Sequence, residues 1–302
     1  MKRVGIFFSA PGFDDPPFNN GDYKQSYHDL AELITQRGGQ CIIVRDAKTF
    51  RGAGTFSHGW VYEYGVFRTT DGPVQLDVLY NKGEAFTADE QTVMINDPHV
   101  DALCRNKERT IEQFPQFFPK SALVTSETDL SGALGKLGGE MLVVKPTDGW
   151  GGHGVWVGKR GDAFAKIEKY PALIQEFIDT SKGIPGIVKG THDLRILIVG
   201  GQVALSYVRT PPDGTVVANV AQGGSIILVP NEEIPPDALA IAMSIDAEIG
   251  KAGRRVYSVD MGFHEGREWK LFELNPQPGL TSMKWGAGVK RYYELLAEEL
   301  LK

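Results

Sequence analysis

The stretch Val256-Tyr-Ser-Val-Asp260-Met-Gly-Phe263 precedes His264-Glu-Gly-Arg267, and Glu268-Trp-Lys-Leu-Phe-Glu273-Leu-Asn275 follows. Two apolar-rich runs on either side of a glycine-containing turn predict an antiparallel hairpin. If the loop has two or four residues centred on Glu265 and Gly266, Asp260 faces Leu271, and Glu273 lies one diagonal step away. Because side chains alternate between the two faces of a strand, we expect Asp260, Leu271, Glu273 and Asn275 on one face.

This face predicts a metal site. Two carboxylates and an amide oxygen are the hard ligands that magnesium prefers, and substrate phosphates complete its shell. The alternative is a polar, solvated sheet face. Asp and Asn are depleted from strands, and the intervening Phe272 and Leu274 suit a buried opposite face, so the pattern favours magnesium held by Asp260, Glu273 and Asn275. A loop of odd length would reverse the parity and remove this argument.

A glycine-rich loop follows another predicted strand. Met141–Lys145 is apolar and ends in a lysine, and Gly149-Trp-Gly151-Gly152-His153-Gly154 comes shortly after it. Glycine N–H groups can approach phosphate oxygens without obstruction by side chains, and the lysine adds a positive charge. The loop lacks the Gly-Lys-Ser/Thr of a P-loop, and it leads into another strand-like stretch rather than a helix. A phosphate loop and an ordinary turn both fit this pattern.

A second hairpin is predicted where Leu194–Val199 and Val203–Val208 flank Gly200-Gly201-Gln202. Asp193 and Arg195 project from one face of its first strand. Arg195 is expected either to pair with Asp193 or to bind a phosphate through its planar guanidinium.

The first third of the chain alternates strand and helix patterns. Val4–Phe8, Cys41–Val44, Val78–Tyr80 and Val93–Ile95 are strand candidates, and residues 24–37 predict an amphipathic helix. This alternation predicts a small parallel α/β domain. Further helices are expected over residues 105–114, over 127–137 with Ser126 as the N-cap, from Pro235-Pro236 to about Gly250, and over 287–301. The later hairpins give the C-terminal part an α+β character.

Composition excludes several classes of protein. The 302-residue chain has a formal net charge of −6 and shows no basic stripe, which disfavours nucleic acid as a partner. Two cysteines, Cys41 and Cys104, do not make a disulfide framework. No apolar run approaches the ~20 residues that span a bilayer, and the apolar start is too short for a signal peptide. We therefore expect a cytoplasmic protein with no membrane partner; assembly into a homo-oligomer stays open.

Taken in order, these motifs resemble those of the ATP-grasp superfamily over roughly residues 96–285. Within that superfamily they resemble bacterial glutathione synthetase and the ribosomal-protein glutamate ligases. The resemblance implies an ATP-grasp fold preceded by a small α/β domain, with units at 1–97, 98–180 (the lid with the glycine loop) and 181–302 (the part with the magnesium site).

The resemblance also implies residue roles. Lys107 and Lys145 would bind the ATP phosphates, with Gly151, Gly152, His153 and Gly154 in a loop over them. The backbone of Gln175, Glu176, Phe177 and Ile178 would read adenine, and Asp193 and Arg195 would lie near ribose and phosphate. Arg209 would meet an acyl phosphate, Asn219, Gly223 and Gly224 the incoming substrate, and Asp260, Glu273 and Asn275 one or two magnesium (or manganese) ions. The predicted catalytic residues are Arg195, Arg209 and Asn275.

One segment departs from glutathione synthetase. Asn275 is followed by Pro-Gln-Pro278-Gly279-Leu-Thr-Ser282. This run is similar to the Pro-Gly-x-Thr-Ser of D-alanine–D-alanine ligase, where that segment helps to hold the acceptor's carboxylate. The similarity implies that Pro278, Gly279 and Ser282 bind substrate, and it leaves the acceptor unassigned.

The implied reaction is a magnesium- and ATP-dependent ligation of a small carboxylate to an amine on an amino acid or peptide. Attack of the carboxylate on the γ-phosphate gives an acyl phosphate and ADP, and the amine then displaces phosphate. Phosphoryl transfer of this kind needs positioning and charge neutralisation rather than a Cys or Ser nucleophile. An ATP-grasp-like small-molecule kinase and a non-catalytic nucleotide-binding protein are the alternatives.

Overall fold

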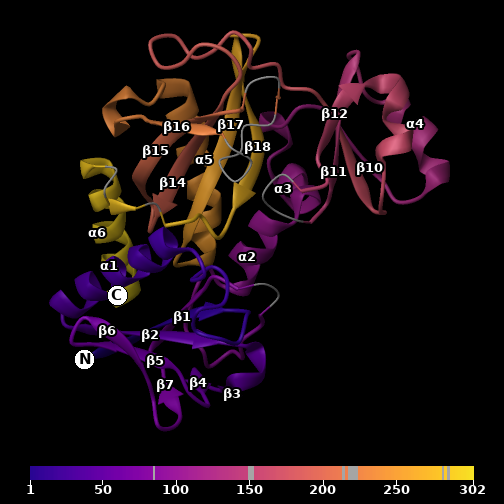
Figure 1. The fold of residues 1–302 in the computed structure, drawn as a ribbon. Helices are drawn as coiled ribbons and strands as arrows, with labels where there is room; N and C mark the ends of the chain where they lie inside the picture. Colours follow the sequence, from indigo (N-terminus) through magenta and orange to yellow (C-terminus); the bar gives the residue numbers. More distant parts are fainter. Residues whose placement is uncertain (84–85, 149–152, 213–214, 217–223, 281, 284–285) are drawn as a thin grey trace.

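The computed structural model describes residues 1–83, 86–148, 153–212, 215–216, 224–280, 282–283 and 286–302. Figure 1 shows the N-terminal domain below a larger C-terminal sheet, with a small sheet to one side. Within the described residues no helix is both long and apolar enough to cross a membrane.

The N-terminal sheet has the strand order β6-β5-β2-β1-β8-β9. Its strands are β1 (Lys2–Phe8), β2 (Gly39–Arg45), β5 (Trp60–Glu63), β6 (Val66–Thr69), β8 (Val78–Asn81) and β9 (Met94–Ile95). The predicted parallel pairing is confirmed for β2, β1, β8 and β9. At the other edge β5 and β6 pair antiparallel, which was not predicted. The short strands β3 (Phe50–Gly52), β4 (Thr55–Phe56) and β7 (Val74–Gln75) form a separate small sheet.

The two ends of the chain share one core. Helix α1 (Gly21–Gln36) begins at Asn20, whose side chain accepts a hydrogen bond from the backbone N–H of Tyr23. Such a cap satisfies one of the free donors at the start of a helix. The buried face of α1 includes Tyr27, Leu30 and Ile34, and it packs against the last helix, α6 (Ala287–Leu301). The C-terminal helix therefore fastens the N-terminal domain to the rest of the molecule.

The C-terminal sheet is antiparallel, with the order β16-β15-β14-β17-β18. Its strands are β14 (Asp193–Val199), β15 (Gln202–Thr210), β16 (Ser225–Leu228), β17 (Val256–His264) and β18 (Glu268–Asn275). One apolar core joins this sheet to α5 (Pro236–Ile249) and to α2 (Pro98–Arg105). The helix predicted over 105–114 is wrong at its start: Asn106 ends α2 and caps α3 (Lys107–Gln113) by accepting from the N–H of Arg109.

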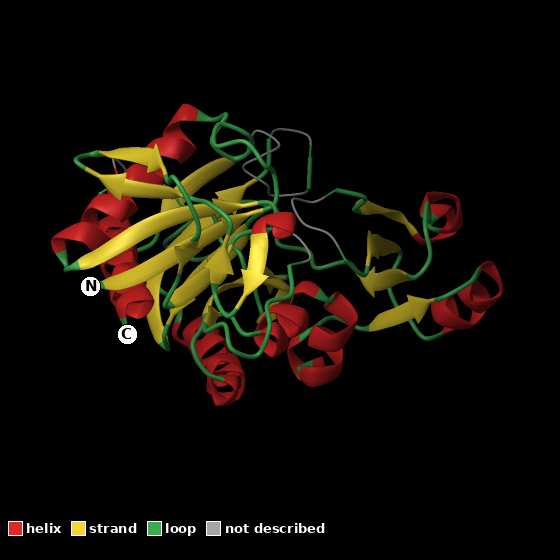
Figure 2. Ribbon diagram, turned by 90° about the horizontal axis from the view of Figure 1, so that it is seen from below, coloured by secondary structure: helices red, strands yellow, loops and turns green. Residues whose placement is uncertain are grey.

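The small sheet has the order β10-β13-β11-β12 and a core of its own. Its strands are β10 (Ser121–Val124), β11 (Met141–Pro146), β12 (Trp156–Lys159) and β13 (Ala172–Glu176), with α4 (Leu130–Gly135) packed on them. Figure 2 shows this unit projecting at one side of the molecule. The helix predicted over 127–137 is shorter than expected, and Ser126 does not cap it, because its hydroxyl contacts that of Thr128. Our division at 97/98 stays a prediction; Val100, Cys104 and Phe114 pack with the C-terminal core.

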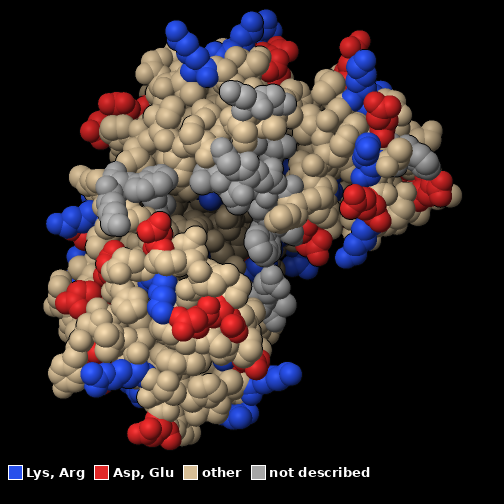
Figure 3. All heavy atoms as spheres, viewed as in Figure 1, with Lys and Arg blue, Asp and Glu red and all other residues tan. Residues whose placement is uncertain are grey.

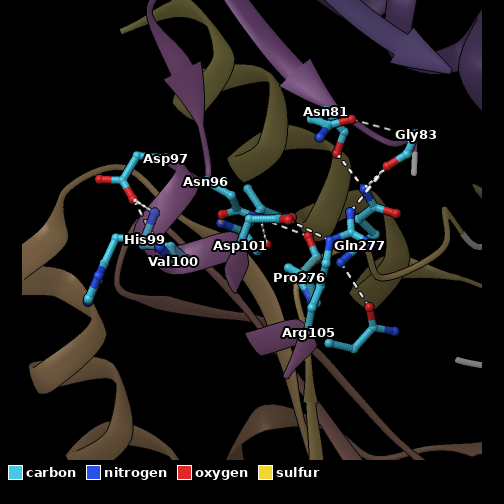
Figure 4. Close-up of polar contacts among 12 residues, drawn as sticks. Asn81, Gly83, Asn96, Asp97, His99, Val100, Asp101, Arg105, Pro276 and Gln277 are labelled. Atoms are coloured by element: carbon cyan, nitrogen blue, oxygen red, sulfur yellow. Dashed lines mark hydrogen bonds and ion pairs between the residues drawn. The ribbon is translucent and has the colours of Figure 1, made fainter. Parts of the chain in front are cut away.

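Asn96 joins the N-terminal domain to the C-terminal sheet (Figure 4). Its amide donates to the carbonyls of Val256 and Pro276, both at 2.7 Å, and its Oδ1 accepts from the N–H of Val256 at 2.7 Å. The residue is buried and has a φ of 57°, a conformation that asparagine tolerates better than most residues. Asn96 therefore satisfies backbone groups of two segments that lie far from it in the chain.

Replacing Asn96 with Ala is expected to lower the free energy of unfolding by about 2–4 kcal/mol, because buried backbone groups lose their partners. Urea denaturation followed by circular dichroism measures this loss. Asn20→Ala is the control, because removing that exposed helix cap costs only about 1 kcal/mol. Equal losses for the two variants would contradict the role given to Asn96.

Candidate active site

The register of the β17–β18 hairpin differs from the prediction. His264 pairs with Glu268, so the loop has an odd number of residues, and Met261 pairs with Leu271. A bulge then shifts the register, and Asp260 pairs directly with Glu273. Phe272 is the extra residue, since a bulge sets two residues on one strand against one on the other. The odd number of loop residues would by itself place Glu273 and Asn275 on the opposite face of the sheet from Asp260. The bulge at Phe272 returns both residues to the face of Asp260.

The bulge decides which residues share a face. Directly paired residues point to the same side of a sheet, so Asp260 and Glu273 share a face. Ser258 and Asn275 form a pair two residues further along the strands, and they lie on that same face. Leu271 is wrongly placed by the prediction: together with Met261 it lies in the apolar core on the other face. The three oxygen-bearing side chains thus lie on one face through a register that the sequence pattern did not reveal.

The oxygens of these three side chains are not equally free to bind a magnesium ion. The Glu273 side chain is 29% exposed, and among the described residues its one ion pair is a long contact with Lys107, at 3.7 Å. Asn275 Oδ1 accepts from the N–H of Gln277 at 2.8 Å, and it has a second lone pair. Asp260 is fully buried, and both of its oxygens accept hydrogen bonds from side chains. The donor types suit magnesium, and Glu273 and Asn275 are the more available ligands.

Asp260 lies at the centre of a buried ion cluster, which we call the quartet: Asp193, Arg195, Arg209 and Asp260. Arg195 Nε donates to Asp260 Oδ1 at 2.7 Å, and a second nitrogen of Arg195 donates to Oδ2. One terminal nitrogen of Arg209 donates both to Asp260 Oδ2, at 2.7 Å, and to Asp193. Of the two alternatives left open for Arg195, pairing with Asp193 is wrong; its partner comes from the adjacent strand β17.

The two acids of the quartet differ in proton affinity. Burial raises the pKa of Asp260, but Arg195 and Arg209 outweigh it and hold the pKa below its usual value. Burial raises the pKa of Asp193 to about 7, and the attraction of Arg209 only partly opposes it. Asp193 Oδ1 and Arg209 Nε are both buried without a partner among the described residues. Buried polar atoms without a partner are rare in folded proteins, so these two atoms mark the quartet as a candidate functional site.

Lys107 and Lys145 approach the same face from two different elements. Lys107 begins α3, and Lys145 lies near the end of β11, where its ammonium donates to the carbonyl of the bulged Phe272 at 3.2 Å. Both side chains are largely buried. Burial and repulsion from Lys107 lower the pKa of Lys145 to about 7, although Glu273 opposes the shift. Two cations held this close favour an anion between them.

The strand predicted to bind adenine is β13, next to β11. Gln175 is buried and donates to Ser121 Oγ at 2.7 Å, and Glu176 accepts from the N–H of Gly138 at 2.5 Å. Both side chains therefore form hydrogen bonds within the small-sheet unit. The N–H of Phe177 donates to the carbonyl of Met141 at 3.4 Å, and Ile178 is buried. The adenine role of these residues stays a prediction.

The remaining predicted residues fall into three groups. Gly151, Gly152, Asn219 and Gly223 lie outside the described residues. His153 is exposed, Gly154 has a φ of +70°, and Gly224 directly precedes β16. Pro278 and Gly279 meet the N-terminal domain: the Pro278 carbonyl accepts from Lys82, and a Cβ on Gly279 would lie 3.5 Å from the Tyr23 hydroxyl. Ser282 is half-buried on the same segment.

Lys82 and Arg105 were missed by the sequence analysis. Lys82 directly follows β8, and Arg105 is the last residue of α2. A lysine at a strand end was the signal used for Lys145, and Asn81-Lys82-Gly83 carries the same signal. Figure 4 shows Arg105 and Gln277 directed at Gly83, the residue after Lys82.

The site is cationic although the chain is acidic. Its described cations outnumber its described acids; they are Lys82, Lys107, Lys145, Arg195 and Arg209 against Asp193, Asp260 and Glu273. Figure 3 shows the surface hollowed between the N-terminal domain and the upper body, with acidic and basic side chains interspersed elsewhere on this face. A concentration of buried cations in a protein of net charge −6 is typical of a site for a polyanion.

Comparisons with known proteins identify the fold. D-alanyl-alanine synthetase A from Vibrio cholerae superposes with a TM-score of 0.66 at 13% identity, over 99% of this chain and 97% of that one. The ATP-grasp ligase PsnB, solved with a phosphomimetic variant of its minimal precursor, Mg and ADP, gives a TM-score of 0.61 at 12% identity, over 99% of both chains. The predicted ATP-grasp fold with its preceding α/β domain is confirmed.

A curated relative extends the comparison to sequence. A probable alpha-L-glutamate ligase from Shewanella halifaxensis is 27% identical over 201 aligned residues, and the match covers 63% of this chain. The match covers 40% of that protein, so the chain spans less than half of its relative's length. The family model described as a RimK-like ATP-grasp domain matches residues 104–298, which contain Lys107, Lys145, the quartet and the β17–β18 hairpin. The chain belongs to the RimK-like ATP-grasp family.

Proposed function

We propose that this protein is an ATP- and magnesium-dependent ligase that joins a carboxylate to an amine on an amino acid or peptide. The observation that carries the proposal is the convergence of Lys107 and Lys145 on Glu273, beside Asp260 and its two arginines. Oxygen ligands next to buried cations suit a metal-bound triphosphate. Membership of the RimK-like ATP-grasp family, and a relative named as an alpha-L-glutamate ligase, support the same reaction.

Each residue has a task in this proposal. Glu273 and Asn275 would hold magnesium, with Asp260 as the third ligand, and the ion would supply positive charge that neutralises phosphate. Lys107 and Lys145 bind phosphate oxygens, and Arg209, whose Nε has no described partner, meets the acyl phosphate.

Two displacements complete the reaction. In the first, an oxygen of the substrate carboxylate forms a bond to the γ-phosphorus of ATP, and the bond from that phosphorus to ADP breaks. In the second, the amine attacks the acyl carbon, phosphate leaves with the C–O bond electrons, and the nitrogen gives up a proton. The chain contributes alignment and charge, which together supply much of the acceleration in phosphoryl transfer.

The direct test is ADP release from ATP against pairs of amino acids and small peptides, followed by mass spectrometry of the product. We expect release only when magnesium, a carboxylate and an amine are all present, with a product that has lost one water relative to the two substrates. ADP release with a phosphorylated hydroxyl as the product would instead indicate a kinase. Binding of ATP with no ADP across the panel would indicate a non-catalytic nucleotide-binding protein.

Lys145→Met is expected to weaken ATP binding by roughly 10- to 100-fold, the loss that follows removal of a charge-assisted hydrogen bond. The stability of the nucleotide-free protein should change by less than about 1 kcal/mol. Losing the bond to the Phe272 carbonyl destabilises the protein, and removing an ammonium disfavoured by burial offsets that loss. Calorimetric titration with ATP and urea denaturation measure the two quantities.

Lys159→Met is the matched control, because Lys159 is exposed on the neighbouring strand β12. It should leave both quantities unchanged. Unaltered ATP affinity in Lys145→Met would remove this lysine from the proposed phosphate site.

Small carboxylate and amine substrates follow from the proposed reaction. A cytoplasmic location and possible homo-oligomers stay predictions from the sequence.

A further inference from the structure

Lys82 lies where the N-terminal domain meets the C-terminal one. Its ammonium donates to the carbonyl of Pro278 at 2.7 Å and lies 5.3 Å from the centre of the Tyr80 ring. The side chain is half-buried, so a ligand can reach it. Pro278 belongs to the segment that leaves the metal-site strand after Asn275. Lys82 therefore touches the proposed active site from the opposite domain.

The surroundings of Lys82 do not balance its charge. Among the described residues no acidic side chain forms an ion pair with it, and the charged groups that influence it most are Arg105 and Arg195. Each arginine already has an acidic partner: Arg105 pairs with Asp101, and Arg195 pairs with Asp260. Lys82 therefore lies near two other positively charged side chains, and an anionic ligand would stabilise this arrangement.

The position of Lys82 is fixed from both sides. The carbonyl of the next residue, Gly83, accepts from Arg105 at 3.1 Å and from Gln277 Nε2 at 2.7 Å (Figure 4). A Cβ on Gly83 would lie only 2.5 Å from the Phe7 ring, so glycine is required for this close approach. The backbone next to Lys82 is thus held in place, and the Pro278 carbonyl holds its ammonium, so little freedom is lost when a ligand arrives.

We infer that Lys82, with Arg105 beside it, is an anion subsite that binds the non-reacting carboxylate of the amine-bearing substrate. This inference rests on the proposed function. The carboxylate that is activated must lie by the phosphates, near Lys107 and Glu273, whereas Lys82 contacts the segment beyond Asn275. Amino acids and peptides carry a carboxylate besides their amine, so a cation on the N-terminal domain can orient the amine toward the acyl carbon.

The proton affinity of Lys82 agrees with this assignment. Burial, together with Arg105 and Arg195, lowers the pKa of Lys82 to about 7 in the ligand-free protein. A bound carboxylate favours the ammonium form and reverses that shift. The ligand-free subsite thus lacks the counter-charge that the substrate would bring.

The test compares each amine-bearing substrate with its carboxamide, which keeps the shape and removes the charge. Wild-type protein should prefer the free acid, and Lys82→Met should raise KM for the free acid by about 10- to 100-fold. The KM for the carboxamide and for ATP should stay unchanged. Lys82→Arg should restore part of the preference. Lys48→Met, at an exposed lysine of the same domain, is the matched control.

A second measurement does not need turnover. Trace acetylation with acetic anhydride at pH 7, read by mass spectrometry, reports how accessible and how neutral the amine of Lys82 is. A free-acid substrate should lower acetylation of Lys82 and leave Lys48 unaffected, and its carboxamide should protect neither. This readout also serves if Lys82→Met does not fold.

The outcomes separate the two hypotheses. An unchanged KM for free acids in Lys82→Met, or equal protection by acids and carboxamides, overturns the subsite while the ligase activity stands. Absence of ADP release in wild-type protein overturns the proposed function, and selective protection of Lys82 by free-acid amino acids would still support the subsite. Failure of every acid in the panel to protect Lys82 overturns the subsite as well.

Discussion

Glu273→Ala is expected to lower ADP formation by about 10³-fold, which is the upper range for removing one preorganised electrostatic contact from an active site. Glu273 is the most exposed acidic group of the proposed metal site, and its only described ion pair is the 3.7 Å contact with Lys107. Its carboxylate is thus available to a metal at little structural cost. The free energy of unfolding should fall by less than about 1 kcal/mol, since a contact as long as 3.7 Å to a partly exposed carboxylate contributes little.

Nucleotide binding separates loss of a metal ligand from loss of structure. Glu273→Ala should bind magnesium–ATP more weakly than wild-type protein does. It should bind metal-free ATP at least as well, because a carboxylate that repels the phosphates is gone. Glu268→Ala, at the other end of β18 and paired with Lys270 at the surface, is the matched control. Undiminished turnover in Glu273→Ala would remove Glu273 from the metal site.

The sequence pattern predicted the hairpin well and its register poorly. Alternation and the Glu265-Gly266 turn locate both strands, because these signals are local. The bulge at Phe272 has no comparable local signal; its carbonyl is held by Lys145, which lies on another sheet. The predicted shared face of Asp260 and Glu273 therefore depended on two register errors that cancelled, while Leu271 shows the error that did not.

Other misses share this cause. Arg195 was weighed against Asp193, its neighbour in sequence, yet it pairs with Asp260 across the sheet. Lys82 went unnoticed because its importance depends on Pro278, which only the folded chain brings to it. Family motifs located the residues, and spacing located the elements. Partners on neighbouring strands and in another domain required the structure.

Asp260→Asn is expected to lower the free energy of unfolding by about 3–5 kcal/mol, the cost of removing one partner from a buried ion pair. Asparagine has nearly the shape of aspartate, so packing changes little. It removes the charge that Arg195 and Arg209 share, and Asp193 then faces both buried guanidinium groups alone. Asp193 contacts Arg209 and forms no ion pair with Arg195 among the described residues, so this remaining acid compensates for the lost charge only in part.

The pH dependence follows from the same shifts. In wild-type protein the pKa of Asp260 lies below its unfolded value, so its contribution to stability is full above the unfolded pKa and is lost as pH falls through the folded one. The pKa of Asp193 is raised instead, so Asp193 costs stability as pH rises through its unfolded value, up to about 7. Wild-type protein should therefore lose its advantage over Asp260→Asn as pH falls below 4, as urea denaturation at several pH values measures.

Two further variants decide whether the quartet explains the loss. Glu248→Gln removes an exposed acid paired with Lys251 and should cost less than about 0.5 kcal/mol. Adding Arg209→Met to Asp260→Asn removes one of the stranded cations, so the double variant should be more stable than the sum of the two single losses predicts. Additive losses would mean that Asp260 stabilises the fold by something other than its charge. Turnover should be lost in both Asp260 variants, because they remove a proposed metal ligand whether or not stability recovers.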